Sequence, residues 1–184
     1  GLNVTIPYKE AIIPYLDKLS KKATKIGAVN TIKINKKGKL IGYNTDCYGF
    51  KKSIKPHLKP IHKRALILGT GGASKAIAFA LKQLDIDYQF VSRHPSENGF
   101  LTYNDVTDDV IGSHLIIINC TPLGTYPNIE EAPEIPFTAI TKNHILYDLI
   151  YNPEETLFLK NGNNYKAKTI NGSSMLKFQA DKAW

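Results

Sequence analysis

Short apolar stretches recur along most of the chain, each followed by a longer segment of mixed polarity. Residues 115–119 are almost entirely apolar, which is typical of a parallel strand covered on both faces of its sheet. Strands are expected at 64–68, 88–91, 115–119, 145–150 and 166–170, and helices at 73–81, at 154–160 behind Pro153 and from Met175 onward, with a single helical turn within 105–111. Strands that alternate with helices predict an α/β fold.

The N-terminal part shows a different pattern, that of a hairpin with helices around it. Residues 35–38 read Asn-Lys-Lys-Gly, a turn between two stretches of strand-like alternation. Strands are expected at 2–6, 27–34 and 39–43, and helices at 8–19, with an interruption at Pro14, and at 47–54.

Composition describes an ordinary globular protein, because 42% of the 184 residues are hydrophobic and 22% are charged. No apolar run approaches the roughly 20 residues that a membrane-spanning helix needs, and no segment resembles a secretory signal. The two cysteines, Cys47 and Cys120, lie far apart and belong to no C-x-x-C pair. We therefore expect a cytoplasmic protein without a metal site and without a membrane partner.

The net charge of +8 results from 24 Lys and Arg against 16 Asp and Glu. The lysines are spread along the chain, and aromatic residues do not interleave with them as they do in RNA-binding sheets. Nucleic acid is therefore not an expected partner. The charge indicates a solvated basic surface, or one that attracts small anionic ligands.

A glycine-rich turn follows the first strand of the α/β part. Residues 64–68 end in an apolar run, and Gly69-Thr70-Gly71-Gly72-Ala73 then precede a segment of strong helix propensity. In a dinucleotide-binding βαβ unit, Gly69 would allow the tight turn, and Gly71 would let backbone N–H groups approach a pyrophosphate at the helix N-terminus. The pattern departs at the third small position, which is Ser74. Strand, turn and helix in this order favour a dinucleotide site over a plain βα turn.

Polar side chains gather at four predicted strand ends, where a packed sheet does not need them. Each cluster alone is typical of a turn or a cap, because Asn and Asp often bond to their own backbone there. The four clusters are Asn3 with Thr5 and Lys9, Asn30 with Thr31, Asn44-Thr45-Asp46, and Asn119 with Thr121.

Together with the glycine turn, these clusters make the chain resemble the shikimate dehydrogenases over nearly all of its 184 residues. Seven blocks occur in the order of that family. They are residues 3–9 (NVTIPYK), 27–31 (GAVNT), 42–46 (GYNTD), 69–74 (GTGGAS), 119–124 (NCTPLG), 147–151 (YDLIY), and Asn171-Gly172 followed by Met175-Leu176 and Gln179-Ala180.

The resemblance implies a two-domain α/β enzyme that reversibly reduces 3-dehydroshikimate to shikimate with NADPH, on the route to chorismate and the aromatic amino acids. Residues 1–45 and 171–184 would form the substrate domain, and residues 46–170 a Rossmann-like domain. Lys9 and Asp46 would form the catalytic pair. The substrate contacts would be Thr5, Asn30, Tyr151 and Gln179, and the cofactor would lie beside Gly69, Thr70, Gly71, Gly72, Ala73, Leu149 and Gly172.

The residues after the second strand of the α/β part indicate which cofactor is used. An NAD-binding site usually has an acidic residue there, whereas this chain has Ser92 and Arg93, which can bind a 2′-phosphate. NADP is therefore the expected cofactor. Glu97 stands near where the family usually has a second basic residue, so we expect a weaker preference for NADP than in members with two.

Two alternatives stay open from the sequence: a quinate/shikimate dehydrogenase that uses NAD, and a catalytically silent dinucleotide-binding protein of the same fold. A homodimer is also compatible with it. The chain starts directly on a predicted strand and stops at Trp184 within a predicted helix, so the substrate domain looks truncated. In the family, a serine pair on an earlier strand holds the substrate carboxylate. We expect a chain without that segment to bind NADP but to bind shikimate poorly.

Overall fold

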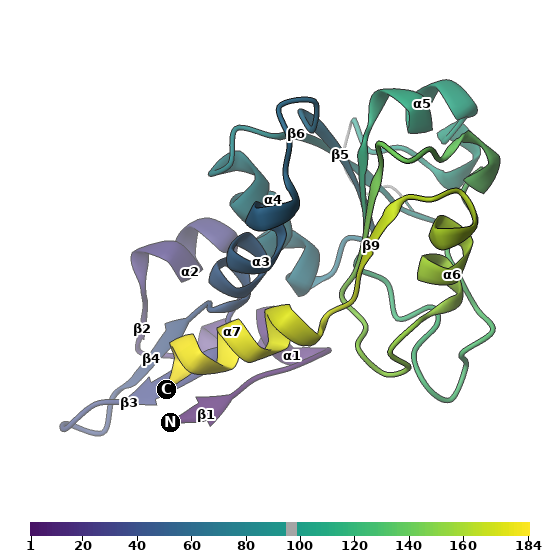
Figure 1. The fold of residues 1–184 in the computed structure, drawn as a ribbon. Coiled ribbons are helices and arrows are strands. Elements are labelled where there is room, and N and C mark those ends of the chain that lie inside the picture. The colour runs from purple at the N-terminus through teal and green to yellow at the C-terminus, as the bar shows by residue number, and fades with distance from the viewer. Residues whose placement is uncertain (95–98) are drawn as a thin grey trace.

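The computed structural model describes residues 1–94 and 99–184, which form one small and one large β-sheet with helices packed around them (Figure 1). The small sheet belongs to the N-terminal part of the chain. The large sheet contains every strand from Arg64 onward. This arrangement confirms the predicted α/β class.

The small sheet has the strand order β1-β3-β4-β2. Its centre is the predicted hairpin, in which β3 and β4 pair antiparallel and Gly38 takes a φ of +75° in the turn. The Asn35 side chain accepts the backbone N–H groups of Lys37 and Lys39, so this residue closes the turn. The strands are β1 (Leu2–Asn3), β2 (Lys18–Leu19), β3 (Thr31–Ile34) and β4 (Leu40–Tyr43).

The helices of this part differ from the predicted ones. The helix expected at 8–19 is a short turn, α1 (Tyr8–Ala11), followed by a 3-10 turn at Ile13–Tyr15 that contains Pro14 and then by β2. A helix that the sequence analysis did not predict, α2 (Lys21–Ile26), starts where the Ser20 side chain accepts the N–H of Ala23. The helix expected at 47–54 is confirmed as α3 (Asp46–Ile54), which continues into a 3-10 turn at Lys55–His57.

The large sheet is parallel throughout and has the order β6-β5-β7-β8-β9. Leu68 pairs with Val91 on one side and with Asn119 on the other, and Asn119 pairs with Asp148, so the carboxyl ends of four strands meet at one edge. All five strands expected from the apolar stretches are present: β5 (Arg64–Leu68), β6 (Asp87–Val91), β7 (Ile116–Asn119), β8 (Ile145–Asp148) and β9 (Lys168–Ile170).

Helices cover both faces of this sheet and bury an apolar core on each. One core contains Phe50 and Leu81, and the other contains Ile117 and Phe158. Besides α3, the helices are α4 (Gly72–Lys82), α5 (Asp108–Ser113), α6 (Leu157–Asn164) and α7 (Ser173–Ala183), with 3-10 turns at Tyr103–Asp105 and Phe137–Ala139.

The start predicted for α6 is wrong. The helix was expected at 154–160 with Pro153 in its first turn, but it starts at Leu157. The cause is Thr156, whose side chain accepts the N–H of Leu159 and so caps the helix.

The last helix, α7, returns to the first part of the chain and packs against α3 (Figure 1). The two helices approach closely at Gly49, where a Cβ atom would lie 2.6 Å from the carbonyl oxygen of Met175. Residues distant in sequence therefore meet beside the small sheet. The division into a substrate domain (1–45 and 171–184) and a Rossmann-like domain (46–170) stays a prediction.

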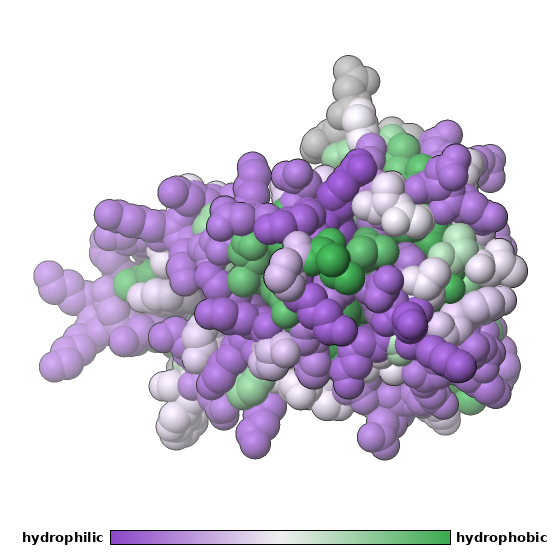
Figure 2. All heavy atoms as spheres, turned by 45° about the horizontal axis from the view of Figure 1, so that its top comes forward, coloured by the Kyte–Doolittle hydropathy of each residue, from purple (hydrophilic) through white to green (hydrophobic). Residues whose placement is uncertain are grey.

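Hydrophilic side chains cover most of the face shown in Figure 2, with a small apolar patch near its centre. Within residues 1–94 and 99–184, no helix is long and apolar enough to cross a membrane. Nor does this part of the chain gather three or more His, Cys, Asp or Glu side chains in a way that could hold a metal ion.

Candidate active site

The centre of the site is an ion pair between Lys9 of α1 and Asp46, the first residue of α3. The Lys9 Nζ and Asp46 Oδ2 atoms lie 2.7 Å apart, and the two side chains are only 13% and 6% exposed. The N-terminus of α3 also favours a carboxylate in its first turn. Two residues that the sequence analysis placed in one catalytic pair are thus brought together from separate segments.

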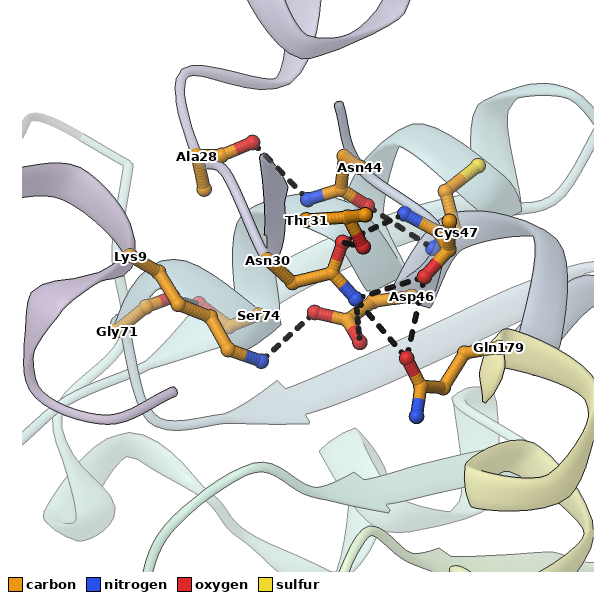
Figure 3. Close-up of polar contacts among 11 residues, drawn as sticks. Lys9, Ala28, Asn30, Thr31, Asn44, Asp46, Cys47, Gly71, Ser74 and Gln179 are labelled. Atoms are coloured by element: carbon orange, nitrogen blue, oxygen red, sulfur yellow. Dashed lines mark hydrogen bonds and ion pairs between the residues drawn. The ribbon is translucent and has the colours of Figure 1, made fainter. Parts of the chain in front are cut away.

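Asn30 holds the other oxygen of the Asp46 carboxylate (Figure 3). Its Nδ2 atom lies 2.9 Å from Asp46 Oδ1, 2.8 Å from Thr45 Oγ1 and 3.2 Å from Gln179 Oε1. Its Oδ1 atom accepts the backbone N–H of Thr45 at 2.8 Å and the hydroxyl of Thr31 at 3.1 Å. Because the amide has two hydrogens for three acceptors, its donors are fully used, and its orientation is fixed.

Gln179 reaches this network from α7, although 149 residues separate it from Asn30. Its Oε1 atom also accepts the Thr45 hydroxyl at 3.1 Å. The other end of the amide, the Nε2 atom, points away from the network (Figure 3). Gln179 therefore presents a hydrogen-bond donor beside the Lys9–Asp46 pair.

Asn44 and Thr45 were noticed as part of a polar cluster, but the sequence analysis did not place them among the site residues. The Asn44 side chain donates to the carbonyl oxygen of Ala28 at 3.0 Å and accepts the N–H of Cys47 at 3.2 Å, and so anchors the start of α3. Thr45 links Asn30 to Gln179, as described above. Their position directly before Asp46 is the feature of the sequence that indicates a place for both residues in the site.

The glycine turn lies at the carboxyl end of β5. Gly69 takes a φ of +100°, a conformation that favours glycine, and its N–H donates to the carbonyl oxygen of Val91 at 2.8 Å. A Cβ atom at Gly71 would meet no atom within 4 Å, so the turn has open space in front of α4. Thr70 and Ala73 are partly exposed in the same turn. This open space at a helix N-terminus fits the pyrophosphate of a dinucleotide.

Ser74, the departure from the usual glycine pattern, is 1% exposed. Its hydroxyl donates to the carbonyl oxygen of Gly71 at 2.6 Å. The residue therefore fits a small buried position and satisfies its own polar group within the turn.

Ser92 and Arg93 follow β6 at the same edge of the sheet, as the sequence predicts. Ser92 is buried, and its hydroxyl exchanges hydrogen bonds with the backbone of His94 at 3.2 and 3.3 Å. The Arg93 side chain is exposed. An exposed guanidinium at this edge fits a 2′-phosphate. Glu97 lies outside the described residues.

Gly172 connects β9 to α7 and passes directly over the loop that follows β8. Its N–H donates to the carbonyl oxygen of Ile150 at 2.9 Å, and a Cβ atom on it would lie 2.1 Å from the carbonyl oxygen of Leu149. Only glycine fits at this distance. Leu149 and Gly172 thus lie together at the carboxyl edge, as expected of cofactor neighbours.

Thr5 and Tyr151 are both exposed, and Tyr151 is 52% exposed. Within the described residues, neither side chain joins the hydrogen bonds around Lys9 and Asp46. The structure therefore gathers Lys9, Asn30, Asp46 and Gln179 into one network and leaves these two predicted contacts outside it.

Asp148 is a buried carboxyl group at the end of β8, and the sequence analysis assigned it no role. Burial raises its pKa to about 6, although hydrogen bonds from Thr156, Ile150 and Asn119 oppose this shift. The donor-to-acceptor distances are 2.6 Å from the Thr156 hydroxyl, 3.0 Å from the Ile150 N–H and 3.1 Å from the Asn119 amide. Asp148 thus ties together the loops that follow β7 and β8.

The arrangement can place an ammonium group next to a carbonyl oxygen that gains negative charge. Lys9 would stabilise this charge and supply a proton, while the amides of Asn30 and Gln179 are suited to hydroxyl groups. The dinucleotide turn lies directly against α1, since a Cβ atom on Gly72 would be 3.0 Å from the Cβ of Lys9. This geometry suits hydride transfer coupled to proton transfer.

Comparison with known proteins agrees with this chemistry. The family model described as shikimate dehydrogenase substrate binding domain matches residues 1–32. A shikimate dehydrogenase (NADP(+)) from Carboxydothermus hydrogenoformans is 41% identical over an alignment of 197 positions, gaps included. The alignment covers 97% of this chain and 69% of that protein.

Solved structures extend the similarity to the fold. The shikimate 5-dehydrogenase from Thermus thermophilus, in complex with NADP(H) and shikimate, has a TM-score of 0.84 at 32% identity and covers 98% of this chain and 70% of that one. Quinate dehydrogenase from Corynebacterium glutamicum, in complex with NAD, has a TM-score of 0.85 at 30% identity and covers 99% of this chain and 70% of that one.

Proposed function

Because the chain belongs to the shikimate dehydrogenase family, we propose that it catalyses the NADP-dependent interconversion of 3-dehydroshikimate and shikimate. The observation that carries this proposal is the Lys9–Asp46 ion pair, which has a 2.7 Å separation and lies against the glycine turn. The ion pair places a proton donor next to a glycine turn that fits a dinucleotide.

When NADPH is bound, it supplies the hydride that reduces the substrate ketone. Lys9 then stabilises the negative charge on the ketone oxygen and delivers a proton to it. Asp46 holds the Lys9 ammonium through Oδ2, while Asn30 fixes Oδ1. In the direction of oxidation the same pair takes the hydroxyl proton.

Asn30 and Gln179 orient the substrate ring through amide groups that both donate and accept hydrogen bonds. Gln179 contributes its outward-pointing nitrogen (Figure 3). Thr5 and Tyr151, which are exposed, contribute further contacts when the substrate is bound.

The cofactor is held by the turn at the carboxyl edge of the large sheet. Backbone N–H groups around Gly71 would bind the pyrophosphate, with Thr70 and Ala73 beside it, while Gly72 would let α4 start directly against α1. Arg93 would pair with the 2′-phosphate, and Ser92 would support the same loop. Leu149 and Gly172 would lie near the nicotinamide.

Steady-state kinetics test this function. We expect NADPH oxidation with 3-dehydroshikimate and NADP reduction with shikimate, each at higher efficiency than with NAD or quinate. Turnover with no combination of these substrates, at concentrations high enough to offset weak binding of shikimate, would contradict the proposal. A preference for NAD and quinate would instead replace it with the activity named for the Corynebacterium glutamicum structure.

A further inference from the structure

We propose that Gly72 is a positioning residue for Lys9, with a role distinct from that of Gly71. A Cβ atom built on Gly72 would lie 3.0 Å from the Cβ of Lys9 and 3.6 Å from both the Cβ of Ala28 and the Cγ of Glu10. The same atom built on Gly71 would meet nothing within 4 Å. One glycine therefore faces the open cofactor side of the turn, and its neighbour faces the helix that carries the catalytic lysine.

The contact involves the Cβ atom of Lys9, which is the first atom of its side chain. A clash with a distant lysine methylene could be relieved by rotation, but the Cβ position is set by the backbone of α1. Lys9 is held there from the other side, because its carbonyl oxygen accepts the N–H of Val29 at 2.7 Å. To accept a methyl group on Gly72, α1 or α4 must therefore shift by a few tenths of an ångström.

A second contact ties the same two helices together. Lys75 of α4 and Glu10 of α1 form an ion pair at 2.5 Å, with side chains 41% and 43% exposed. Glu10 directly follows Lys9, so the pair adds a second, exposed contact between α1 and α4 at the level of the glycine turn. The close approach at Gly72 and the Glu10–Lys75 pair set the position of the Lys9 Cβ atom. The ion pair with Asp46 sets the position of the Lys9 Nζ atom.

This inference rests on the proposed function for its catalytic meaning, since it assumes that Lys9 acts on the substrate. The geometric part can be tested apart from catalysis. Alanine is a better helix former than glycine, so without the Lys9 contact an alanine at the start of α4 would be harmless.

The test compares Gly72→Ala and Gly72→Val with Gly71→Ala. For Gly72→Ala we expect kcat to fall by up to about tenfold, because a misplacement of about 1 Å can cost about 100-fold and the shift needed here is smaller. The dissociation constant for NADPH, measured by nucleotide fluorescence, should stay within about twofold. Gly71→Ala should show the opposite split, with NADPH binding weakened about tenfold by the methyl group that enters the phosphate space.

Acetylation of the Lys9 amino group, followed by mass spectrometry, gives a readout that needs no turnover. In the parent protein the ion pair should protect Lys9, and in Asp46→Asn it should not. Gly72→Ala and Gly72→Val should move the labelling rate of Lys9 toward that of Asp46→Asn, whereas Gly71→Ala should match the parent.

Parent-like labelling and kcat in folded Gly72→Ala would overturn the proposal. Thermal unfolding confirms that each variant is folded, and Gly72→Ala decides the matter if Gly72→Val does not fold. If the parent itself shows no turnover, the proposed function fails, but the labelling still decides whether Gly72 positions Lys9.

Discussion

Asn30 controls the geometry of the site at the scale of single residues. Its amide nitrogen contacts Thr45, Asp46 and Gln179, and its oxygen is fixed by the backbone of Thr45. Since Asn30 is buried, each of these bonds would be costly to lose. The carboxylate of Asp46 therefore has a fixed direction before any substrate arrives, which is how an active site avoids reorganisation during the reaction.

Replacing Lys9 tests the centre of this network. We expect Lys9→Ala to lower turnover about 10²–10⁴-fold, roughly 3–5 kcal/mol of barrier, because the proton donor is lost. The dissociation constant of NADPH should not change. Steady-state rates within about threefold of the parent would remove Lys9 from the mechanism. Lys36→Ala, on the exposed turn of the hairpin, is the matched control and should leave the rates unchanged.

Asp148 should make stability depend on pH. Its pKa is raised from 3.8 to about 6 in the folded protein, so the folded state binds the proton more tightly than the unfolded state does. The stabilisation from the protonated group is complete below about pH 4 and is lost as pH rises through about 6, and it amounts to about 3 kcal/mol.

Urea denaturation between pH 4 and pH 7 measures this effect. Asp148→Asn keeps the shape of the side chain and removes the charge, so the free energy of unfolding of this variant should lose that part of its pH dependence. Asp181→Asn, at an exposed position of α7, should retain it. Equal pH dependence in the parent and in Asp148→Asn would contradict the prediction.

At the scale of elements, the packing of α3 against α7 brings the two halves of the amide network together. Gly49 makes this possible, since a Cβ atom there would lie 2.6 Å from the carbonyl oxygen of Met175 and 3.0 Å from the Cβ of Gln179. The obstacle at Met175 is backbone, which cannot move aside as a flexible side chain can. Any residue larger than glycine must separate the helices and withdraw Gln179.

We therefore expect Gly49→Ala to lower the free energy of unfolding by about 1–3 kcal/mol and to raise the KM for shikimate. The matched control is Gly112→Ala in α5, where an added Cβ atom would meet nothing within 4 Å. There the gain in helix propensity should stabilise the protein by about 0.5–1 kcal/mol. Chemical denaturation should give changes in the free energy of unfolding of opposite sign for the two variants, which separates the packing effect from helix propensity. The prediction would be contradicted if Gly49→Ala lost no more free energy of unfolding than Gly112→Ala.

The strongest elements could be predicted from the sequence, and the weak ones could not. The strand β7 is an isoleucine run that is buried on both faces, and its pattern admits few other structures. In contrast, α2 buries only Ala23 and Ile26 among lysines, so its sequence has little hydrophobic periodicity. Only the two capping residues, Ser20 and Gly27, indicate a helix there.

The same distinction applies to the site. Lys9 and Asp46 could be assigned because they stand in blocks that resemble a family. The contact between Gly72 and Lys9 could not, because it depends on how α1 and α4 approach each other in space. The raised pKa of Asp148 could not be predicted either, because nothing in the neighbouring sequence indicates that this end of β8 is buried.

At the scale of the whole molecule, the net charge of +8 favours a polyanionic cofactor. The carboxyl ends of the parallel strands present the glycine turn and Arg93 at one edge of the large sheet. Long-range attraction would bring the nucleotide to the protein, and in the proposed function Arg93 would distinguish NADP by its extra phosphate. Raising the ionic strength should weaken the long-range attraction more than the contact of Arg93 with the phosphate, because salt screens most strongly those charges that lie more than a Debye length apart.

Arg93→Ala should lower kcat/KM with NADP about 10–100-fold, the loss expected for one hydrogen bond to a charged group. Efficiency with NAD should stay within about twofold, since NAD lacks the 2′-phosphate. Arg64→Ala, at the opposite end of β5, removes the same charge far from the turn and should affect both cofactors equally. Equal losses for both cofactors in Arg93→Ala would show that this arginine does not distinguish them.

The distance of 149 residues between Asn30 and Gln179 has a consequence for biosynthesis. The ribosome delivers the hairpin and the lysine-bearing turn first, and α7 emerges only after the entire parallel sheet has been translated. A nascent chain therefore holds the glycine turn early, but it completes the amide network only once α7 has emerged. Mistranslation within α7 would leave the amide of Asn30 and the hydroxyl of Thr45 without their Gln179 partner.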